Sequence, residues 1–274
     1  MKRTIFLAAS LLLSGLAFAQ LQAGRIIYEK ISKTQVNIMA GNVDAETKKQ
    51  IPVSRKETTE LLFGNNQAVL RTLPDAGAEA DQMNGEAKQM QFMKMPGGGS
   101  EDNVFFDFST GTKASAAELN SKKYVIEDTL AKLEWKITGE TKQILGYTAI
   151  KATADTKAKK GITTMENGQM KLKETEETIP VVAWFTKEIP VAGGPTYQGQ
   201  LPGMILSLDM GNGKAVYNAV EVSPKVNLAS IKEPKGGKKI SRVEYAKLQK
   251  IALDERTKYL QDNLGKEVKM ETKQ

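Results

Sequence analysis

Short segments in which apolar and polar residues alternate run through most of the chain, separated by turn-forming residues. This two-residue period is typical of strands that bury one face. We interpret the following segments as strands: 24–34, 58–63, 68–72, 104–108, 123–127, 133–139, 144–153, 181–185, 204–208 and 215–222. Because no helical segments separate them, the pattern predicts an antiparallel all-β architecture, a curved sheet or a partly closed barrel.

Three of the connections have compositions that predict tight turns. Residues 64–67 (GNNQ) suit a hairpin turn in which the central residues have positive φ. Asn167 and Gly168 predict a projecting hairpin between two mostly polar arms. Residues 209–213 (DMGNG) join the last two predicted strands. These turns favour strands that are neighbours both in sequence and in the sheet.

Two stretches depart from the strand pattern. Residues 74–103 contain three successive glycines and many Ala, Gln, Asp and Glu, which predicts a long mobile loop. Near the end of the chain, Ser241 and Glu244 fit a capping box. Apolar residues then recur at helical spacing, so we predict a C-terminal amphipathic helix over 241–264 that covers the sheet, with a membrane-surface helix as the alternative.

Residues 1–19 have the pattern of a secretory signal peptide. Lys2 and Arg3 precede an apolar stretch, and Ala-Phe-Ala ends at residue 19 as a cleavage site. The apolar stretch is shorter than the ~20 residues that a spanning helix needs, so we expect no transmembrane segment. We therefore expect residues 20–274 to form one exported domain, in the periplasm or associated with the outer membrane.

Composition excludes several classes of chemistry. The 274 residues include no Cys and no His. A Ser-His-Asp triad, a thiolate nucleophile, a zinc knuckle and a disulfide are therefore impossible. We recognise no catalytic motif and expect a non-enzymatic protein without a cofactor. A hydrolase built on carboxylates stays as a third hypothesis, with these candidates: Glu127, Asp128, Glu134 and Glu140.

Several motifs, taken in order, resemble a known family. Residues 199–206 (GQLPGMIL) follow 183–190 (AWFTKEIP) and 193–195 (GGP), and this arrangement resembles the signature of the GLPGLI family of exported Gram-negative proteins. Residues 135–137 (WKI) and 144–147 (ILGY) are similar to the family's other strong segment. Because the function of that family is unknown, the resemblance supports the fold and the location but implies no mechanism.

The chain departs from the family pattern at three positions. Gln200 replaces the first Gly of the name motif, and Met204 replaces its second Leu. Ala149 stands where many members carry Cys. The change at Gln200 puts in doubt any role that needs a bare backbone there, and the change at Ala149 removes the only thiol that a member of this kind would have.

The segment 190–203, called the Pro-Gly corner below, allows two interpretations. Its prolines remove backbone donors and its glycines permit turns, so the segment can carry the chain round a corner between two strands. The functional alternative is a loop that lets a ligand approach the backbone. The candidate ligand-binding residues are Trp184, Gly193, Gly194, Pro195, Leu201, Pro202 and Gly203.

From the predicted curved sheet and the Pro-Gly corner, we predict that the protein is a binding module. Its expected partner is an apolar, lipid or peptide ligand, or an envelope protein, bound on the concave face of the sheet or at the Pro-Gly corner. Our alternative function is a copper-binding protein, because Met90, Met93 and Met95 would supply soft thioether ligands from the predicted loop. Methionine as adaptable apolar cover is the other interpretation of these three residues.

Charge adds one further candidate surface. Lys and Arg number 39 against 32 Asp and Glu, a formal net charge of +7. A basic cluster before the final helix would attract anionic lipid, or would simply form a solvated face. Its members are Lys232, Lys235, Lys238, Lys239 and Arg242. Nucleic acid is not an expected partner for an exported chain with 6% aromatic residues.

Overall fold

The strands of this protein form one twelve-stranded sheet. The structure is a computed structural model that describes residues 21–37, 50–73, 103–130, 132–166 and 169–271. The strand order is β12-β6-β5-β4-β3-β2-β1-β11-β10-β9-β8-β7. All neighbouring strands are antiparallel except β12 and β6, which are parallel. The prediction of an all-β fold with a curved, incompletely closed sheet is therefore confirmed.

The bounds of the elements follow. The strands are β1 (Gly24–Asn37), β2 (Gln50–Gly64), β3 (Gln67–Leu73), β4 (Asn103–Asp107), β5 (Thr112–Leu119), β6 (Lys122–Thr129), β7 (Lys136–Ile144), β8 (Tyr147–Glu166), β9 (Gln169–Thr186), β10 (Met204–Met210), β11 (Ala215–Ser223) and β12 (Lys238–Ser241). A short 3-10 helix η1 (Leu228–Ser230) follows β11, and the helix α2 (Arg242–Glu271) ends the described chain.

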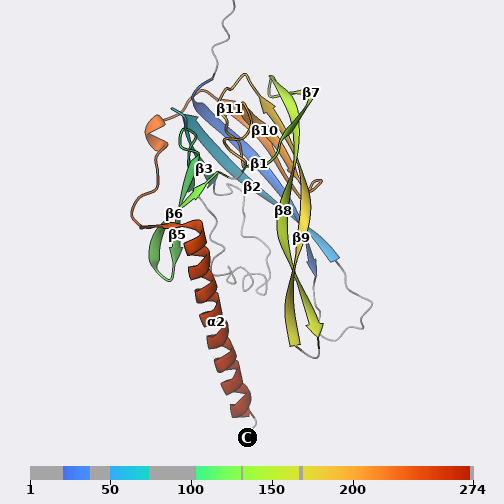
Figure 1. The fold of residues 1–274 in the computed structure, drawn as a ribbon, viewed down its shortest axis with the longest axis vertical. Helices are drawn as coiled ribbons and strands as arrows, with labels where there is room; N and C mark the ends of the chain where they lie inside the picture. Colours follow the sequence, from blue (N-terminus) through green and yellow to red (C-terminus); the bar gives the residue numbers. More distant parts are fainter. Residues whose placement is uncertain (1–20, 38–49, 74–102, 131, 167–168, 272–274) are drawn as a thin grey trace, which may run out of the picture.

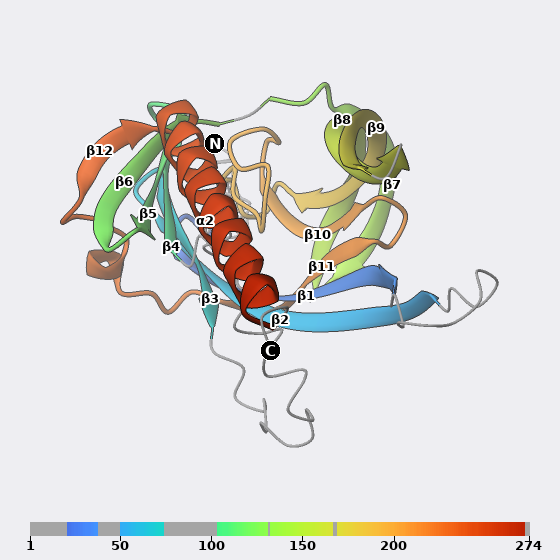
Figure 2. The ribbon, with the colours of Figure 1, turned by 90° about the horizontal axis from the view of Figure 1, so that it is seen from below.

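The sheet curves around the Pro-Gly corner. Figure 2 shows β12, β6 and β5 on one side, β2 and β1 below, and β9 and β8 on the other side, with the corner inside the curve. The two edge strands, β12 and β7, do not pair with each other. We call the concave side of the sheet, which holds the corner, the inner face, and the opposite side the outer face.

Two strands are much longer than the alternating pattern predicts. β8 and β9 pair from Ile150 and Phe185 to Glu166 and Gln169, so the predicted polar arms of the hairpin are the ends of these strands. β7 pairs with β8 only as far as Thr153, and the rest of β8 and β9 extends from the sheet as a two-stranded ribbon (Figure 1). Polar residues on both faces hid this ribbon from a prediction based on one buried face.

Two strands, β5 and β12, have no counterpart among the predicted strands. The sequence of β5, TKASAAEL, contains three alanines and no Val or Ile, so Thr112 is its one β-branched residue. β5 pairs with β4 from Thr112 to Ser115 and with β6 along its whole length. Tertiary pairing therefore overrides a weak local preference here.

The predicted turn at 64–67 is confirmed. Asn65 and Asn66 have φ of 52° and 59°, the positive values that a two-residue hairpin turn needs. Asn120 and Ser121, between β5 and β6, have φ of 50° and 60° and make a second turn of this kind.

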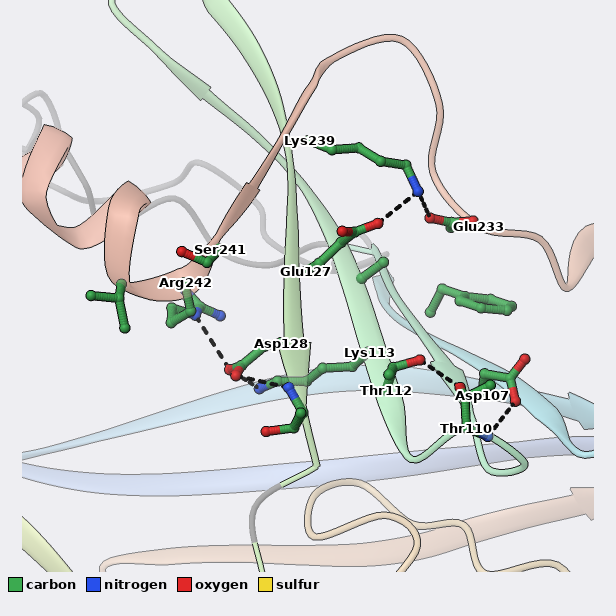
Figure 3. A pocket seen from close by; sticks show the side chains of 14 residues that line it. Asp107, Thr110, Thr112, Lys113, Glu127, Asp128, Glu233, Lys239, Ser241 and Arg242 are labelled. Carbon is green, nitrogen blue, oxygen red and sulfur yellow. Dashed lines mark hydrogen bonds and ion pairs between the residues drawn. The ribbon is translucent and has the colours of Figure 1, made fainter.

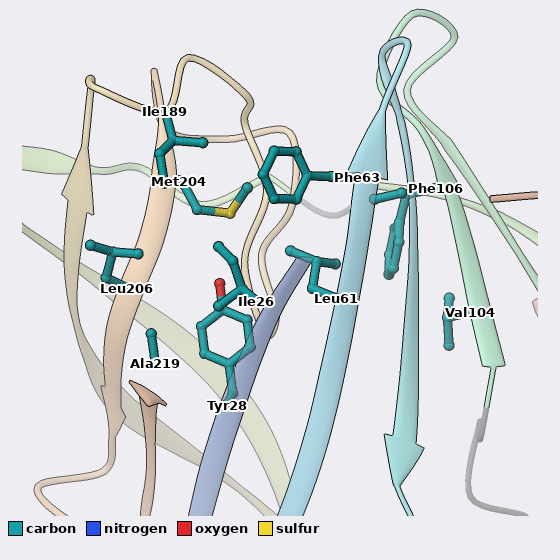
Figure 4. Packing of buried hydrophobic residues seen from close by; sticks show 11 residues of the cluster. Ile26, Tyr28, Leu61, Phe63, Val104, Phe106, Ile189, Met204, Leu206 and Ala219 are labelled. Atoms are coloured by element: carbon teal, nitrogen blue, oxygen red, sulfur yellow. The ribbon is translucent and has the colours of Figure 1, made fainter. Parts of the chain in front are cut away.

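The core is built from both faces of the sheet. On the inner face, a buried cluster gathers side chains from β1, β2, β3, β4, β10 and β11, together with Ile189 just before the corner (Figure 4). These residues are Ile26, Tyr28, Leu61, Phe63, Ala68, Val104, Phe106, Ile189, Met204, Leu206 and Ala219. On the outer face, Leu62, Val69 and Phe105 pack with Ile231 from the segment after η1. Burial on both faces explains the unbroken apolar runs in β2 and β4.

The start of the predicted C-terminal helix is confirmed, and its predicted end is wrong. The Glu244 backbone N–H donates to Ser241 Oγ at 3.2 Å, and the Ser241 N–H donates to Glu244 Oε2 at 2.9 Å, which completes the capping box. The helix continues past Leu264 to Glu271, so Gly265 does not end it. A single glycine costs a helix about 1 kcal/mol, which good helix formers on both sides can offset.

Only the first turns of α2 pack on the sheet. Tyr245 and Ala252 are buried with Ile126 and Ile240 of the neighbouring strands, and the rest of the helix extends beyond the sheet (Figure 1). No helix among the described residues is long and apolar enough to cross a membrane.

Four predictions concern residues outside the described part of the chain. These are the signal peptide at 1–19, the loop at 74–102, the methionines Met90, Met93 and Met95, and the turn at Asn167 and Gly168. Asn103, assigned to the loop by the prediction, is the first residue of β4. Within the described residues, no group of three or more carboxylates is arranged to hold a metal ion.

Candidate ligand-binding site

The Pro-Gly corner folds back on itself between β9 and β10. Gly199 N donates to Ala192 O at 2.6 Å, and Ile205 N donates to Gly193 O at 2.9 Å. The Gln198 side chain, 5% exposed, closes the loop from within by donating to Gly194 O at 2.9 Å. A loop rich in proline cannot form the regular hydrogen bonds of a strand. These bonds satisfy its backbone groups instead, so the corner can be buried on the inner face of the sheet.

Three glycines of the corner pack closely against neighbouring residues, and Gly203 does so against backbone atoms. A Cβ added to Gly203, whose φ is +153°, would lie 2.1 Å from the Thr186 carbonyl oxygen. A Cβ on Gly193 would lie 2.8 Å from Met204 Cε, and one on Gly194 would lie 2.9 Å from Ile205 Cβ. Packing within the protein therefore accounts for the absence of side chains at these positions.

The other candidate ligand-binding residues lie in different surroundings. Pro195 lines a pocket between the corner and the sheet. Leu201 is buried in a core cluster, and Pro202 is exposed. Trp184 lies between the inward-facing Ala183 and Phe185 and so on the outer face, where Lys142 Nζ is 4.2 Å from the centre of its ring. A ligand contact for these residues stays a prediction.

The pocket beside Pro195, which we call the inner pocket, has a volume of about 220 Å³. It lies between strands β3, β4 and β5 and the corner. Its lining residues are Leu70, Val104, Phe106, Lys113, Leu130, Pro195, Thr196, Tyr197, Gln198 and Gln200. Lys113 is the one charged residue among these described lining residues. Five of these ten residues are apolar, and a cavity that combines apolar lining with a few polar groups is typical of small-molecule sites.

Tyr197, at the rim of the inner pocket, has an unusual backbone. Its φ is 54°, which is uncommon for a bulky residue and costs of order 1–3 kcal/mol unless the surroundings hold it. Its ring packs edge to face against Trp135, with the ring centres 5.9 Å apart. Burial raises the pKa of Tyr197 above its ordinary value. Such strained residues cluster at ligand sites.

Gln200, where the chain departs from the family motif, holds the linker between β6 and β7. Its Oε1 accepts hydrogen bonds from Leu133 N at 2.8 Å and from Trp135 Nε1 at 2.9 Å. The linker carries Leu130, which lines the inner pocket, and Trp135, which supports Tyr197. The side chain that replaces glycine in the motif thus has a bonding role that the motif alone does not show.

Replacing Gln200 with Ala is expected to lower the free energy of unfolding by about 1–2 kcal/mol, because two partly buried donors lose their acceptor. Urea unfolding measures this change, and amide exchange should show faster exchange at Leu133. Gln143→Ala is the matched control, since its exposed side chain donates to Thr148 Oγ1 at the surface and its loss should cost less than about 0.5 kcal/mol. Equal losses in the two variants would contradict the role of Gln200.

A second pocket, the junction pocket, lies where β12 meets the start of α2 and the ends of β4, β5 and β6 (Figure 3). Its volume is about 610 Å³, and it is lined by charged and apolar side chains. Lys239 lies between Glu127 at 2.6 Å and Glu233 at 2.8 Å, and these carboxylates raise its pKa. Hydrogen bonds from Ser109 and Gln67 lower the pKa of Asp107 to about 2.

Asp128 of the junction pocket is shared between two cations. Lys113 Nζ lies 3.5 Å from Asp128 Oδ2, and Arg242 Nε lies 3.8 Å from the same oxygen. Three of the carboxylates proposed for a hydrolase thus lie in ion pairs: Glu127 and Asp128 here, and Glu140 with Lys151 at 3.0 Å. This arrangement suits charge recognition better than acid catalysis, which needs a carboxyl group with a raised pKa.

The predicted basic cluster is divided by the fold. Lys239 and Arg242 pair with acids of the junction pocket, as described above. Lys232 and Lys235 line a groove of about 830 Å³ on the outer face, beside Arg71. Arg71 itself pairs with Glu60, whose side chain is 6% exposed. The positive charge of the cluster is therefore spread over two surfaces.

Comparisons with known proteins match one family model and several solved structures. A family model described as a protein of unknown function (Porph_ging) matches residues 135–207, which include β7, β8, β9, the corner and the first part of β10. A structure of PNGF-II in space group C2 is 17% identical, with a TM-score of 0.49, over 84% of this chain and 33% of that chain. A second structure of PNGF-II, in space group P21, is 18% identical with a TM-score of 0.47, over 84% and 34%.

The chain thus spans about a third of the length of the solved structures that it matches. No curated protein matches. The predicted resemblance to a family of unknown function is supported by the match at 135–207, while the GLPGLI name stays a prediction.

Proposed function

We propose that this protein is a non-enzymatic binding module that holds a small, largely apolar ligand in the inner pocket. The observation that supports the proposal is the pocket itself, a cavity of about 220 Å³ between the Pro-Gly corner and the inner face of the sheet. Leu70, Val104, Phe106 and Leu130 supply its apolar lining. The strained Tyr197 at the rim is consistent with a site that is preorganised for binding.

The size of the pocket limits the ligand. Because one water molecule occupies about 30 Å³ of liquid, the inner pocket has room for roughly seven groups of that size. A short alkyl chain or a single aromatic ring fits this volume. A diacyl lipid would fit only with most of each chain outside the pocket.

We further propose that the protein works in the cell envelope. The signal-like pattern at 1–19 supports export. Sequencing the N-terminus of protein from an envelope fraction tests this part, with Gln20 expected as the first residue. Retention of Met1 in that material would contradict it.

The main test fills the inner pocket. Leu130→Trp places a large side chain at a partly buried lining position and is expected to abolish a bound adduct. The measurement is native mass spectrometry of protein purified from an envelope fraction, compared with protein expressed without residues 1–19. The expected result is a small organic adduct in the wild-type envelope sample and none in the variant.

Leu228→Trp serves as the control, because Leu228 is 44% exposed and does not line the inner pocket. This variant should keep the adduct. Retention of the adduct by Leu130→Trp would contradict the site. A mass increment that matches copper and is lost when Met90, Met93 and Met95 are changed to Leu would instead support the alternative function.

A further inference from the structure

We infer that the ligand of the inner pocket is a single-chain monoanion, a short alkyl carboxylate whose head meets Lys113. This inference rests on the proposed function and names the chemical class of its ligand. Three features of the site carry it: the position of Lys113, the pairing of its present partner, and the size of the apolar space.

Lys113 occupies the boundary between the two pockets. In the sheet, it lies directly opposite Phe106 of β4 and Asp128 of β6. Lys113 is the one described residue that lines both the inner pocket and the junction pocket. A chain lying against Phe106 and Leu130 would therefore place its head at the Lys113 ammonium, on the inner face of the sheet.

The charge around Lys113 favours an anion. No acid lines the inner pocket among the described residues, so a ligand inside it meets a cation only. The present partner, Asp128, lines the junction pocket and also lies 3.8 Å from Arg242. A ligand carboxylate can replace Asp128 at Lys113 while Asp128 keeps Arg242, so the exchange leaves no carboxylate without a cation.

The same surroundings argue for one negative charge and not two. Lys113 is the one cation among the described residues that line the inner pocket, and Asp128 already lies 3.5 Å from it. The nearby Lys239 is held between Glu127 and Glu233. A dianionic phosphate head would therefore find one cation for two charges. A carboxylate matches the single available cation.

The test compares two probes of equal chain length, octanoate and octan-1-ol. Their alkyl chains match the space for roughly seven groups that the inner pocket provides. Titration of the isotope-labelled protein by NMR gives both dissociation constants and the amides that shift. The wild-type protein is expected to bind octanoate roughly tenfold more tightly than octan-1-ol, since a hydrogen bond between charged groups is worth more than a neutral one.

Two variants distinguish the contribution of the ligand's head group to binding from that of its alkyl chain. Lys113→Met keeps a long apolar stem but removes the charge. It should weaken the binding of octanoate roughly tenfold and leave the dissociation constant of octan-1-ol unchanged. Asp128→Asn removes the carboxylate that competes for Lys113 and should lower the dissociation constant of octanoate several-fold. Lys239→Met is the matched control, because Lys239 lines the junction pocket but not the inner pocket, and should change neither constant.

The outcomes distinguish this inference from the proposed function. If octanoate and octan-1-ol bind equally well, or if Lys113→Met leaves their ratio unchanged, the carboxylate inference is overturned and the apolar pocket stands. If neither probe shifts the amides of Phe106, Leu130 or Tyr197, both proposals are overturned. Both proposals are supported if Leu130→Trp binds neither probe and Lys113→Met changes the ratio of the two dissociation constants.

Discussion

Gly203→Ala is expected to lower the free energy of unfolding by roughly 3 kcal/mol or more, a large part of the 5–15 kcal/mol typical of a domain. The added methyl group would lie 2.1 Å from the Thr186 carbonyl oxygen and 2.8 Å from its carbon. Both are backbone atoms at the end of β9, so no side-chain rotation can relieve the contact. The backbone at φ +153° is also one that alanine rarely adopts.

Urea unfolding measures the effect, and the matched control is Gly213→Ala. Gly213 also has a positive φ, +85°, but an added Cβ there would meet no atom within 4 Å. The control should lose about 1 kcal/mol, the cost of the backbone conformation alone. Losses of equal size at Gly203 and Gly213 would contradict the packing argument and leave only the backbone cost.

Met204→Ala is expected to lower the free energy of unfolding by about 2–5 kcal/mol, the range for truncation of a large core side chain. Met204 is fully buried, and its terminal methyl lies against the bare backbone of Gly193 and near the inner-face cluster. Figure 4 shows its sulfur close to Phe63 and Ile189. Truncation would leave a cavity where the corner meets the sheet.

Met204→Leu gives a sharper comparison because leucine stands at this position in the family motif. The substitution nearly conserves volume and should cost less than about 1.5 kcal/mol in urea unfolding. The inner pocket should keep its probe affinity in this variant, since Met204 does not line it. A loss as large as that of Met204→Ala would show that the flexible thioether is needed to pack against Gly193.

The parts of the fold that the sequence predicts are those determined by neighbouring residues. Asn65 and Asn66 specify a turn because both tolerate positive φ, and Ser241 with Glu244 specifies a helix start because the two side chains bond the backbone three residues apart. Strands with one buried face are likewise predicted from neighbouring residues, because apolar and polar positions alternate along them. The Pro-Gly corner is likewise evident from composition, because proline excludes a ladder strand.

Other features depend on residues far apart in the chain. β5 is a strand because β4 and β6 pair with it, although its alanines do not favour one. Lys113 was not among the candidate site residues, because nothing in its local sequence separates it from the other lysines. Gln200 was noted only as a departure from a motif, and its bonds to Leu133 and Trp135 span more than sixty positions.

The sequence by itself determined the strand class, the hairpin turn at 64–67, the cap of the final helix and the place of the Pro-Gly corner, because each follows from local steric and hydrogen-bonding preferences. Only the tertiary structure decided the strand order, the curvature of the sheet and the packing of the corner on the inner face. That packing leaves a pocket beside Pro195 and brings Lys113 to its edge. Contacts between distant segments form these features, and one sequence carries no direct sign of which distant residues will meet.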